Sequence, residues 1–456
     1  MTRMTLVEWL AYIERQHPRS IEMGLERVRQ VAASLGLGRP ARRVVTVGGT
    51  NGKGSTVAFI EAIAREAGWR VGAYTSPHLL AYNERVRIDG REVPDSQFVA
   101  AFEAVEAARA DTTLTYFEYG TLAALWLFAR ADLDLAILEV GLGGRLDATN
   151  LVDPDVAVIT TVDLDHQDWL GGDREAIGFE KAGIARAWRP LVLGDDDPPA
   201  SVLRHAYAIG ASAIRAGCDY FFDLVPADAR SDTAYWQWRE VGCDLVLPRP
   251  ALAAPVQLCN AAAAIAALRA LDLDIPVAAI ATGVADARLP ARLQRLQRDD
   301  IEVVVDVGHN PQAARALAAW LASTPIGGRT HAVFAALADK DAPGVVGALA
   351  GQVDAWHLAG LEAGARGQPV DALAARLAGT PAGDGALLEG EAFLGHVAQA
   401  GHQRRTGAAG PRHRHLGGAV LGLVGVAADE VELGHPALPG PAQRVPDQRL
   451  VRAPVL

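Results

Sequence analysis

Residues 43–68 read RVVTVGGTNGKGSTVAFIEAIAREAG, and this stretch decides the fold. A short β-branched run comes first, a glycine-rich turn follows, and apolar residues at helical spacing come last. This order predicts a strand, a loop and a helix, which is the unit from which parallel α/β sheets are built. We therefore expect an α/β fold.

The glycine-rich turn, Gly48–Thr56, predicts a loop that binds nucleotide phosphates. It departs from the strict GxxxxGK[ST] pattern, because Val47 stands where the first glycine belongs and Gly54 separates Lys53 from Ser55. The features that bind phosphate are retained despite this change. Glycines let backbone N–H groups face phosphate oxygens, the start of the helix adds positive potential, and Lys53 supplies a cation. The alternative is a glycine turn that binds no ligand.

Length and composition describe a globular protein of more than one domain. The chain has 456 residues, of which 50% are hydrophobic and 21% charged, and its net charge is −11. This acidic balance argues against a nucleic-acid partner. The longest uncharged apolar run, Leu416–Ala428, is too short to cross a bilayer. We therefore expect no membrane partner. Three cysteines form no CxxC pair, which favours a reducing, cytoplasmic compartment. A monomer is the default expectation.

Alternating apolar and Ala-rich segments predict parallel α/β construction throughout the chain. Residues 5–37 have apolar positions at helical spacing and predict two helices separated by a loop. The remaining apolar runs that predict strands are 135–141, 156–163, 189–194, 303–308 and 331–337.

We expect two domains and a tail. Residues 1–288 predict a P-loop-type ATPase domain with a parallel sheet, and residues 289–400 predict a smaller Rossmann-like α/β domain. Residues 401–456 are rich in Gly, Pro, Arg and His. This composition predicts either a disordered extension or the product of a shifted reading frame.

Polar residues follow two predicted strands and suggest a metal site. Glu139 ends the first strand, while Asp163, Asp165, His166 and Asp168 follow the second. Carboxylates at the carboxyl edge of a parallel sheet suit Mg²⁺, with His166 as a less usual nitrogen ligand. The alternative is a loop in which these groups only hydrogen-bond to one another.

Lysine is rare in this chain. Of 43 basic residues, only Lys53, Lys181 and Lys340 are lysines. Where a cation alone is needed Arg serves, so a retained Lys marks a site that needs a compact or deprotonatable amine, although chance is the alternative. For Lys181 two chemical reasons exclude Arg: a tuned amine, or carbamylation by CO₂ to give an anionic metal ligand.

The C-terminal half repeats the strand, loop and helix pattern. Asp306 and His309 follow the strand of residues 303–308, Arg292 precedes it, and charged residues 339–341 follow the next strand. Exits of parallel strands are where α/β proteins bind ligands. Each of these residues alone is equally typical of a solvated loop.

The motifs together resemble the bacterial folylpolyglutamate synthase/dihydrofolate synthase family, Mur-ligase-like enzymes that form amides with ATP. The resemblance extends from about residue 5 to about residue 395. The motifs that carry it are GGTNGKGST (48–56), TSPHL (75–79), ERVRIDG (84–90), TYFE (115–118), LEVGLGGRLDATN (138–150), TTVDLDHQDWLG (160–171), EKAGI (180–184), PARLQ (290–294) and DVGHNP (306–311). Residues 9–28 resemble the proteobacterial bifunctional form.

The resemblance implies a fold, an activity and a set of substrates. Transfer of a phosphoryl group from ATP to a carboxylate would give an acyl phosphate, which the amine of L-glutamate attacks. The acceptors would be dihydropteroate and reduced folates, and the cofactor would be Mg²⁺, with two ions.

The resemblance also assigns site residues. Lys53, Lys181 and His309 are implied as catalytic, with Lys181 carbamylated, and Ser76, Glu139 and His166 as metal ligands. The implied ATP-binding residues are Thr50, Asn51, Gly52, Lys53, Gly54, Ser55, Asn260, Arg292 and Asp306. The implied pterin-binding residues are Ser20, Ile21, Glu22, Met23, Thr115, Tyr116, Phe117, Glu118, Leu146, Asp147 and Ala148.

Three other functions stay open on the residues alone. They are a Mur-type amino-acid ligase of wall synthesis, a nucleotide-binding switch, and a non-catalytic folate-binding protein. The tail departs from the family, because no strand like the family's last one is recognised after residue 395. We therefore expect the C-terminal sheet to lack a strand and to expose an edge.

Overall fold

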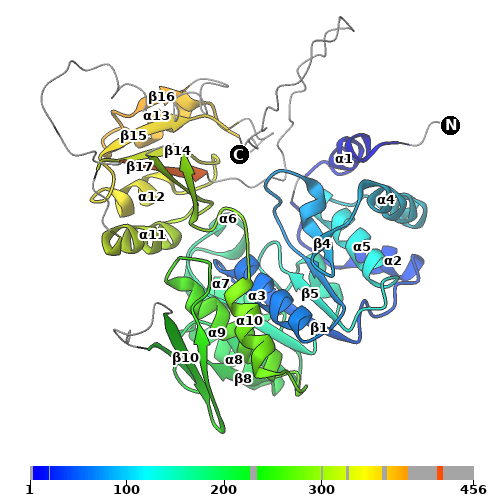
Figure 1. The fold of residues 1–456 in the computed structure, drawn as a ribbon. Coiled ribbons are helices and arrows are strands. Elements are labelled where there is room, and N and C mark those ends of the chain that lie inside the picture. Colours follow the sequence, from blue (N-terminus) through cyan, green and yellow to red (C-terminus); the bar gives the residue numbers. More distant parts are fainter. Residues whose placement is uncertain are drawn as a thin grey trace, which may run out of the picture. The chain divides into compact units, whose positions relative to one another are not determined.

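The computed structural model describes residues 4–19, 21–225, 234–298, 301–324, 328–361, 367–388 and 418–424. The chain divides into two compact units, residues 1–78 with 82–294 and residues 79–81 with 295–456 (Figure 1). The main division falls between Gln294 and Arg295, a few residues beyond the predicted boundary.

The first unit is built on a sheet of eight strands in the order β4, β3, β2, β5, β1, β6, β7, β8. The six strands from β2 to β8 in this order are parallel to their neighbours, whereas β3 and β4 are antiparallel. The bounds are β1 (Arg43–Gly48), β2 (Val71–Tyr74), β3 (Val86–Ile88), β4 (Arg91–Glu92), β5 (Leu135–Glu139), β6 (Val156–Ile159), β7 (Pro190–Leu193) and β8 (Ser212–Arg215). The predicted α/β class is confirmed.

Helices of the first unit include the two that residues 5–37 predict, α1 (Leu6–Glu14) and α2 (Glu26–Ser34). Of the helices in the described part of the chain, none is long and apolar enough to cross a membrane. The other helices of this unit are α3 (Lys53–Glu66), α4 (Asp95–Arg109), α5 (Tyr116–Phe128), α6 (Gln167–Leu170), α7 (Arg174–Ala182), α8 (Ala200–Ile209), α9 (Val256–Arg269) and α10 (Val277–Asp286), with the 3₁₀ turns η1 (Tyr82–Arg85) and η2 (Ala148–Leu151).

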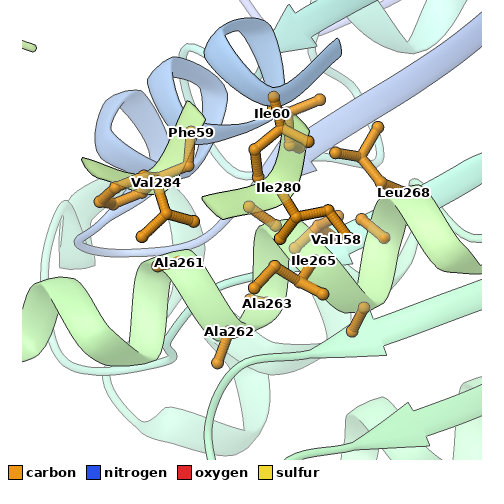
Figure 2. Packing of buried hydrophobic residues seen from close by; sticks show 14 of the residues in the cluster. Phe59, Ile60, Val158, Ala261, Ala262, Ala263, Ile265, Leu268, Ile280 and Val284 are labelled. Atoms are coloured by element: carbon orange, nitrogen blue, oxygen red, sulfur yellow. The ribbon is translucent and has the colours of Figure 1, made fainter. Parts of the chain in front are cut away.

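Both faces of the central strand β1 are buried. Val45 and Val47 point into a cluster with α3, α9 and α10, while Val44 points into a second cluster with α1, α2, α4 and α5. Figure 2 shows side chains of α3, α9 and α10 packed together in the first cluster. Helix α10 approaches α3 closely at Gly283, where an added Cβ would lie 2.5 Å from the Ile63 Cα. Packing on both faces of the sheet therefore fixes the position of β1 relative to α3.

A three-stranded antiparallel sheet corrects the prediction that the chain is parallel throughout. Its order is β11 (Cys243–Pro248), β10 (Tyr235–Glu240), β9 (Tyr220–Leu224). In β10, Trp236 and Trp238 alternate with polar residues and are fully buried, and the Trp238 Nε1–H donates to the Ala262 carbonyl at 3.2 Å. Alternation of apolar and polar residues is typical of an antiparallel strand with one buried face.

The second unit has a six-stranded sheet in the order β12, β13, β17, β14, β15, β16. The strands from β13 to β16 in this order are parallel to their neighbours. Its elements are β12 (Gln294–Arg298), β13 (Ile301–Asp306), α11 (Pro311–Ser323), β14 (Thr330–Ala335), α12 (Ala342–Leu349), β15 (Ala355–Ala359), α13 (Val370–Leu377), β16 (Ala386–Leu388) and β17 (Gly418–Val424).

Strand β17 shows that the predicted loss of the last strand is wrong. Residues 418–424 pair in parallel with both β13 and β14. In the backbone register, Val420 is opposite Val303 of β13 and opposite His331 of β14. The segment reads GAVLGLV, and such an uninterrupted apolar run is typical of a central parallel strand. The sheet therefore has no missing strand at this position. The rest of the predicted tail lies outside the described residues.

Candidate active site

The predicted phosphate loop lies between β1 and α3, as its sequence indicates. Gly49 has φ 147° and Gly52 has φ 86°, both in the left-handed region that favours glycine. A Cβ added at Gly49 would lie 1.9 Å from Thr160 Oγ1. Hydrogen bonds hold the loop to the segment after β6: Thr50 N–H donates to the Thr161 carbonyl at 2.8 Å and Asn51 N–H to Thr161 Oγ1 at 3.0 Å.

Lys53 is the first residue of α3, and its amine folds back over the loop. Its Nζ donates to the carbonyls of Gly49 at 3.0 Å and Thr50 at 3.2 Å. Ser55, in the same first turn, is buried. The loop therefore combines a lysine ammonium with the N-terminus of a 14-residue helix, two features that favour a phosphate group.

Asn260 of α9 contacts this loop from another side. A Cβ added at Gly52 would lie 2.4 Å from Asn260 Oδ1, so the amide lies directly against the loop. Asn260 Nδ2 donates to Gln257 Oε1 at 3.0 Å, and both side chains are buried. The sequence does not predict Gln257 as a site residue, because it is connected to the loop only through its hydrogen bond with Asn260 inside α9.

Glu139 ends β5 and faces the first turn of α3. Its carboxylate oxygens are 3.7 Å from where a Cβ on Gly54 would stand, and Glu139 Oε2 accepts the Ser76 N–H at 3.2 Å. Burial raises the pKa of Glu139, and the charges of Lys53 and Arg292 oppose that rise. The structure therefore brings together Glu139, Ser76, Lys53 and Arg292 from four separate motifs.

Lys181, on α7, is 4% exposed. Burial lowers its pKa to about 7, and the positive charge of Lys53 acts in the same direction, while Asp165 and Asp147 oppose it. A substantial fraction of this amine is therefore neutral near neutral pH. The neutral amine is the form that can react with CO₂.

The acidic segment after β6 is tied to the phosphate loop. Asp163 N–H donates to Thr50 Oγ1 at 3.1 Å, and Thr50 Oγ1 donates to the Asp163 carbonyl at 3.1 Å. His166 immediately precedes α6 as its N-cap and has φ 50°, and its Nε2 lies 3.9 Å from Asp165 Oδ1. The described ranges contain no group of three or more His, Cys, Asp or Glu side chains placed to hold a metal. A metal here would need further oxygen ligands.

Asp306 and His309 belong to the second unit. Asp306 ends β13, and its Oδ1 accepts the Gly308 N–H at 2.7 Å. Asn310 Oδ1 accepts the Ala313 N–H at 3.0 Å and caps α11. These contacts order the turn that carries His309.

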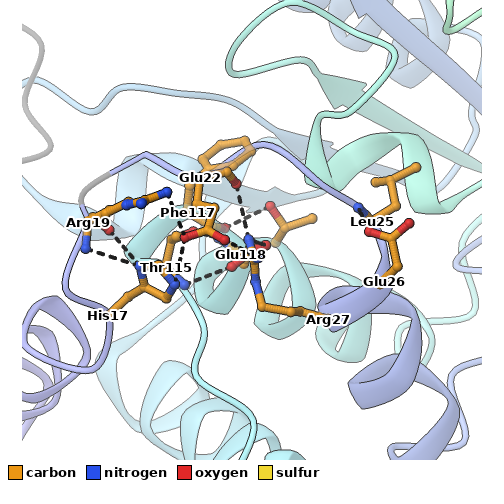
Figure 3. Close-up of polar contacts among 10 residues, drawn as sticks. His17, Arg19, Glu22, Leu25, Glu26, Arg27, Thr115, Phe117 and Glu118 are labelled. Atoms are coloured by element: carbon orange, nitrogen blue, oxygen red, sulfur yellow. Dashed lines mark hydrogen bonds and ion pairs between the residues drawn. The ribbon is translucent and has the colours of Figure 1, made fainter. Parts of the chain in front are cut away.

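Two predicted pterin segments are joined by a residue that was not predicted, Arg27 (Figure 3). Its guanidinium donates to Glu22 Oε1 at 2.9 Å and to Glu118 Oε1 at 2.8 Å. Glu118 also forms a capping box with Thr115: Thr115 N–H donates to Glu118 Oε2 at 2.8 Å, and Glu118 N–H to Thr115 Oγ1 at 3.3 Å. His17 Nε2 lies 3.3 Å from Glu22 Oε2.

The third predicted segment closes against the first. Gly24 N–H donates to the Leu146 carbonyl at 3.4 Å. The Met23 side chain lies 3.5 Å from where a Cβ on Gly143 would stand, and a Cβ on Gly141 would lie 2.6 Å from the Phe117 ring. The structure thus gathers residues from all three predicted pterin segments.

The remaining predicted pterin residues have defined places. The Asp147 carboxylate is buried and accepts hydrogen bonds from the backbone of Leu142 and Thr149, both at 2.9 Å. Tyr116 is half-buried, with its ring centroid 5.8 Å from that of Tyr82. Ile21 is half-buried and Ala148 is buried, whereas Ser20 lies outside the described residues.

Two family models match the chain. The Mur ligase middle domain matches residues 47–268, and the Mur ligase glutamate ligase domain matches residues 291–408. With the phosphate loop at the end of β1 and the α/β architecture, these matches define an ATP-dependent ligase of the Mur ligase class.

Curated relatives narrow the class. The dihydrofolate synthase/folylpolyglutamate synthase of Escherichia coli K12 is 47% identical over 368 residues, 81% of this chain and 84% of the relative. The enzyme of the same name from Haemophilus influenzae is 42% identical over 390 residues, 82% of this chain and 86% of the relative. The chain belongs to the dihydrofolate synthase/folylpolyglutamate synthase family, as its motifs predict, and it is an ATP-dependent glutamate ligase of folate metabolism.

Solved structures agree with this assignment. Escherichia coli FolC in complex with DHPP and ADP matches with a TM-score of 0.83 and 43% identity, covering 93% of this chain and 96% of that one. A bifunctional folylpolyglutamate synthase/dihydrofolate synthase with Mn, AMPPNP and L-glutamate bound matches with a TM-score of 0.80 and 42% identity, covering 92% and 95%.

Proposed function

We propose that the chain joins L-glutamate both to dihydropteroate, forming dihydrofolate, and to reduced folates, extending a polyglutamate chain. The observation that carries this proposal is the course of residues 139–148. This segment begins with Glu139 facing the first turn of α3, and near its other end the Leu146 carbonyl accepts the N–H of Gly24, which directly follows the predicted pterin residues 20–23. One loop therefore links the nucleotide region to the region proposed for the acceptor.

The reaction needs two bond exchanges. An oxygen of the acceptor carboxylate attacks the γ-phosphorus of ATP, the bond to the ADP oxygen breaks, and an acyl phosphate forms. The neutral α-amine of glutamate then attacks the carbonyl carbon, phosphate leaves, and the amine nitrogen releases a proton. Positioning of reactants and neutralisation of phosphate charge are what the protein must supply.

The nucleotide is assigned to the phosphate loop and its neighbours. Backbone N–H groups of residues 52–55 and the ammonium of Lys53 would hold the β- and γ-phosphates, because the N–H groups of Thr50 and Asn51 already donate to Thr161. Asn260 lies against the loop, and Arg292 is close enough to Glu139 to oppose the rise in its pKa. From the second unit, Asp306 is assigned to ATP and His309 to a catalytic role on the family's pattern alone.

A divalent ion fits the residues around Glu139. Glu139 is a buried carboxylate whose pKa is raised, so a cation beside it would relieve the cost of its charge. Ser76 and His166 complete the proposed ligands, and water and ATP phosphate oxygens fill the remaining positions, as Mg²⁺ prefers. When bound, Mg²⁺ neutralises phosphate charge. Manganese is present in a related structure, and we propose two Mg²⁺ ions for this chain.

Lys181 is assigned as a carbamate. Its neutral amine attacks the carbon of CO₂, one proton is released, and the side chain becomes an anion. The lowered pKa of about 7 provides the reactive amine, and the nearby charge of Lys53 favours the anionic product. Arginine cannot do this chemistry, which accounts for a lysine in a chain that otherwise uses arginine.

The pterin ring is assigned to the three gathered segments. Tyr116 and Phe117 present half-buried rings on which a flat heterocycle can stack. All three carboxylates in these segments have partners within the protein, and Glu22 bonds to Arg27 and lies 3.3 Å from His17 Nε2. Glu22 is the most exposed of the three, so it is the acceptor assigned to N–H groups of the ligand.

Phosphate release by the purified full-length chain tests the proposal. ATP and Mg²⁺ are supplied with dihydropteroate or tetrahydrofolate, with and without L-glutamate, and products are weighed by mass spectrometry. We expect release that requires both acceptor and glutamate, with one glutamyl unit added to each acceptor. Release independent of glutamate would instead indicate a nucleotide switch. Light scattering in the same buffer checks the proposed monomer.

A further inference from the structure

Arg27 connects two of the three carboxylates that the predicted pterin segments carry, those of Glu22 and Glu118. Helix α2 begins at Glu26, so Arg27 lies in its first turn, where the guanidinium reaches Glu22 before the helix and Glu118 at the start of α5. A further bond joins Arg27 Nη2 to the Glu22 carbonyl at 3.1 Å. Arg27 therefore holds both the side chain and the backbone of Glu22.

The two carboxylates differ in exposure. The Glu118 side chain is 4% exposed, and its two oxygens are taken by Thr115 N–H and Arg27. The Glu22 side chain is 31% exposed. Glu118 is thus held in place on α5, and Arg27 is the contact that joins it to the half-buried Glu22.

Arg27 keeps its positive charge between Glu22 and Glu118. Burial lowers the pKa of Arg27, but hydrogen bonds and charge from Glu118 and Glu22 outweigh burial and raise it. A guanidinium can bind two carboxylates at once through separate N–H groups, whereas a lysine ammonium acts as a point charge. The bridge therefore depends on arginine geometry as well as on charge.

We infer that Arg27 is a positioning residue for the pterin acceptor, fixing Glu22 and residues 21–24 in the arrangement that receives the ring. This inference rests on the proposed function, because it takes these segments as the acceptor site. The aminopyrimidinone edge of a pterin offers N–H donors, which a carboxylate held in one place accepts well. Arg27 itself need not touch the ligand.

The test compares steady-state constants of full-length variants with dihydropteroate as acceptor. For Arg27→Ala we expect the KM for dihydropteroate to rise by about tenfold or more. A change of this size corresponds to the loss of about one charge-assisted hydrogen bond to the acceptor. The KM for ATP and kcat should change by less than about twofold, because only binding of the acceptor is affected.

Arg29→Ala is the matched control. Arg29 is on the same helix and exposed, and its side chain forms no ion pair or hydrogen bond with any residue that the structure describes. The KM for dihydropteroate should stay unchanged in this variant. A merely structural Arg27 would reduce the active fraction, and hence kcat, without a selective change in this KM.

Two milder variants decide the matter if Arg27→Ala does not fold. Arg27→Lys retains the charge and Glu22→Gln retains the side-chain length, and each should raise the KM for dihydropteroate. Their effects should be less than additive in the double variant, because both break the same contact. Unchanged KM values, or fully additive effects, would overturn the inference. If the wild type adds no glutamate to dihydropteroate, the proposed function fails instead, and the two failures are distinct.

Discussion

The phosphate loop and the acceptor site are built in different ways. The phosphate loop is one continuous stretch whose shape comes from left-handed glycines and backbone hydrogen bonds. The proposed acceptor site gathers three stretches that are far apart in the chain, and the charge of Arg27 holds two of them together. Added side-chain volume should therefore impair nucleotide binding at the loop. Removal of charge should impair binding at the proposed acceptor site.

The largest effect is expected from Gly49→Ala. The new Cβ would lie 1.9 Å from Thr160 Oγ1 at a φ of 147°, so the loop must move. Displacement of a phosphate-binding group by about 1 Å can cost about 100-fold in rate, and we expect at least that loss in turnover. Gly38→Ala is the control, since nothing lies within 4 Å of its added Cβ. Normal turnover by Gly49→Ala would contradict this account of the loop.

An intermediate effect, on the pH dependence of stability, is expected from Lys181→Met. This substitution removes the titratable amine and keeps a side chain of similar size. Because the pKa of Lys181 is about 7 when folded and 10.5 ordinarily, the unfolded chain binds the extra proton between these values. The free energy of unfolding therefore rises with pH across this window, by at most about 1.4 kcal/mol per pH unit.

Urea unfolding in CO₂-free buffer at several pH values measures this slope. The wild type should gain stability from pH 7 to pH 10 relative to Lys181→Met, and below pH 7 the difference should be constant. Added bicarbonate should raise turnover of the wild type and leave the variant unchanged. Parallel pH profiles for the two proteins would show that this lysine titrates normally.

The smallest effect is expected from Thr115→Ala, which removes one bond of the capping box on α5. Loss of an N-cap side chain costs about 1 kcal/mol of stability. The KM for dihydropteroate should rise only slightly, because the Glu118 N–H loses its acceptor while the Glu118 carboxylate keeps both Thr115 N–H and Arg27.

The capping box on α1 is a ready comparison for that variant. Thr5 and Glu8 form the same two reciprocal bonds, with Glu8 N–H donating to Thr5 Oγ1 at 3.3 Å. Thr5→Ala should cost similar stability and leave every kinetic constant unchanged. Equal kinetic effects of the two variants would mean that position in the acceptor site does not matter.

Continuous features of the sequence predicted the structure best. The run through β1, the glycines and α3 was recognised because every residue that shapes the loop is a neighbour in the chain. The strands β5, β6 and β7 were recognised for the same reason, as uninterrupted apolar runs.

Features that depend on distant contacts were missed. Arg27 and Glu118 are 91 positions apart, and no local pattern shows that they meet. Strand β17 is not predicted by the sequence although its seven residues are apolar, because the Gly-, Pro- and Arg-rich sequence around it is typical of a tail. The residues around a strand do not decide whether it pairs, since pairing depends on the neighbouring strands β13 and β14.

Ligand titration of Gly49→Ala and Arg27→Ala tests the contrast between the two regions most directly. Calorimetry would measure binding of a non-hydrolysable ATP analogue and of dihydropteroate to each full-length variant and to the wild type. We predict that Gly49→Ala loses affinity for the nucleotide while retaining dihydropteroate, and that Arg27→Ala does the reverse. Loss of the same ligand in both variants, or of neither, would contradict the separation of nucleotide and acceptor sites.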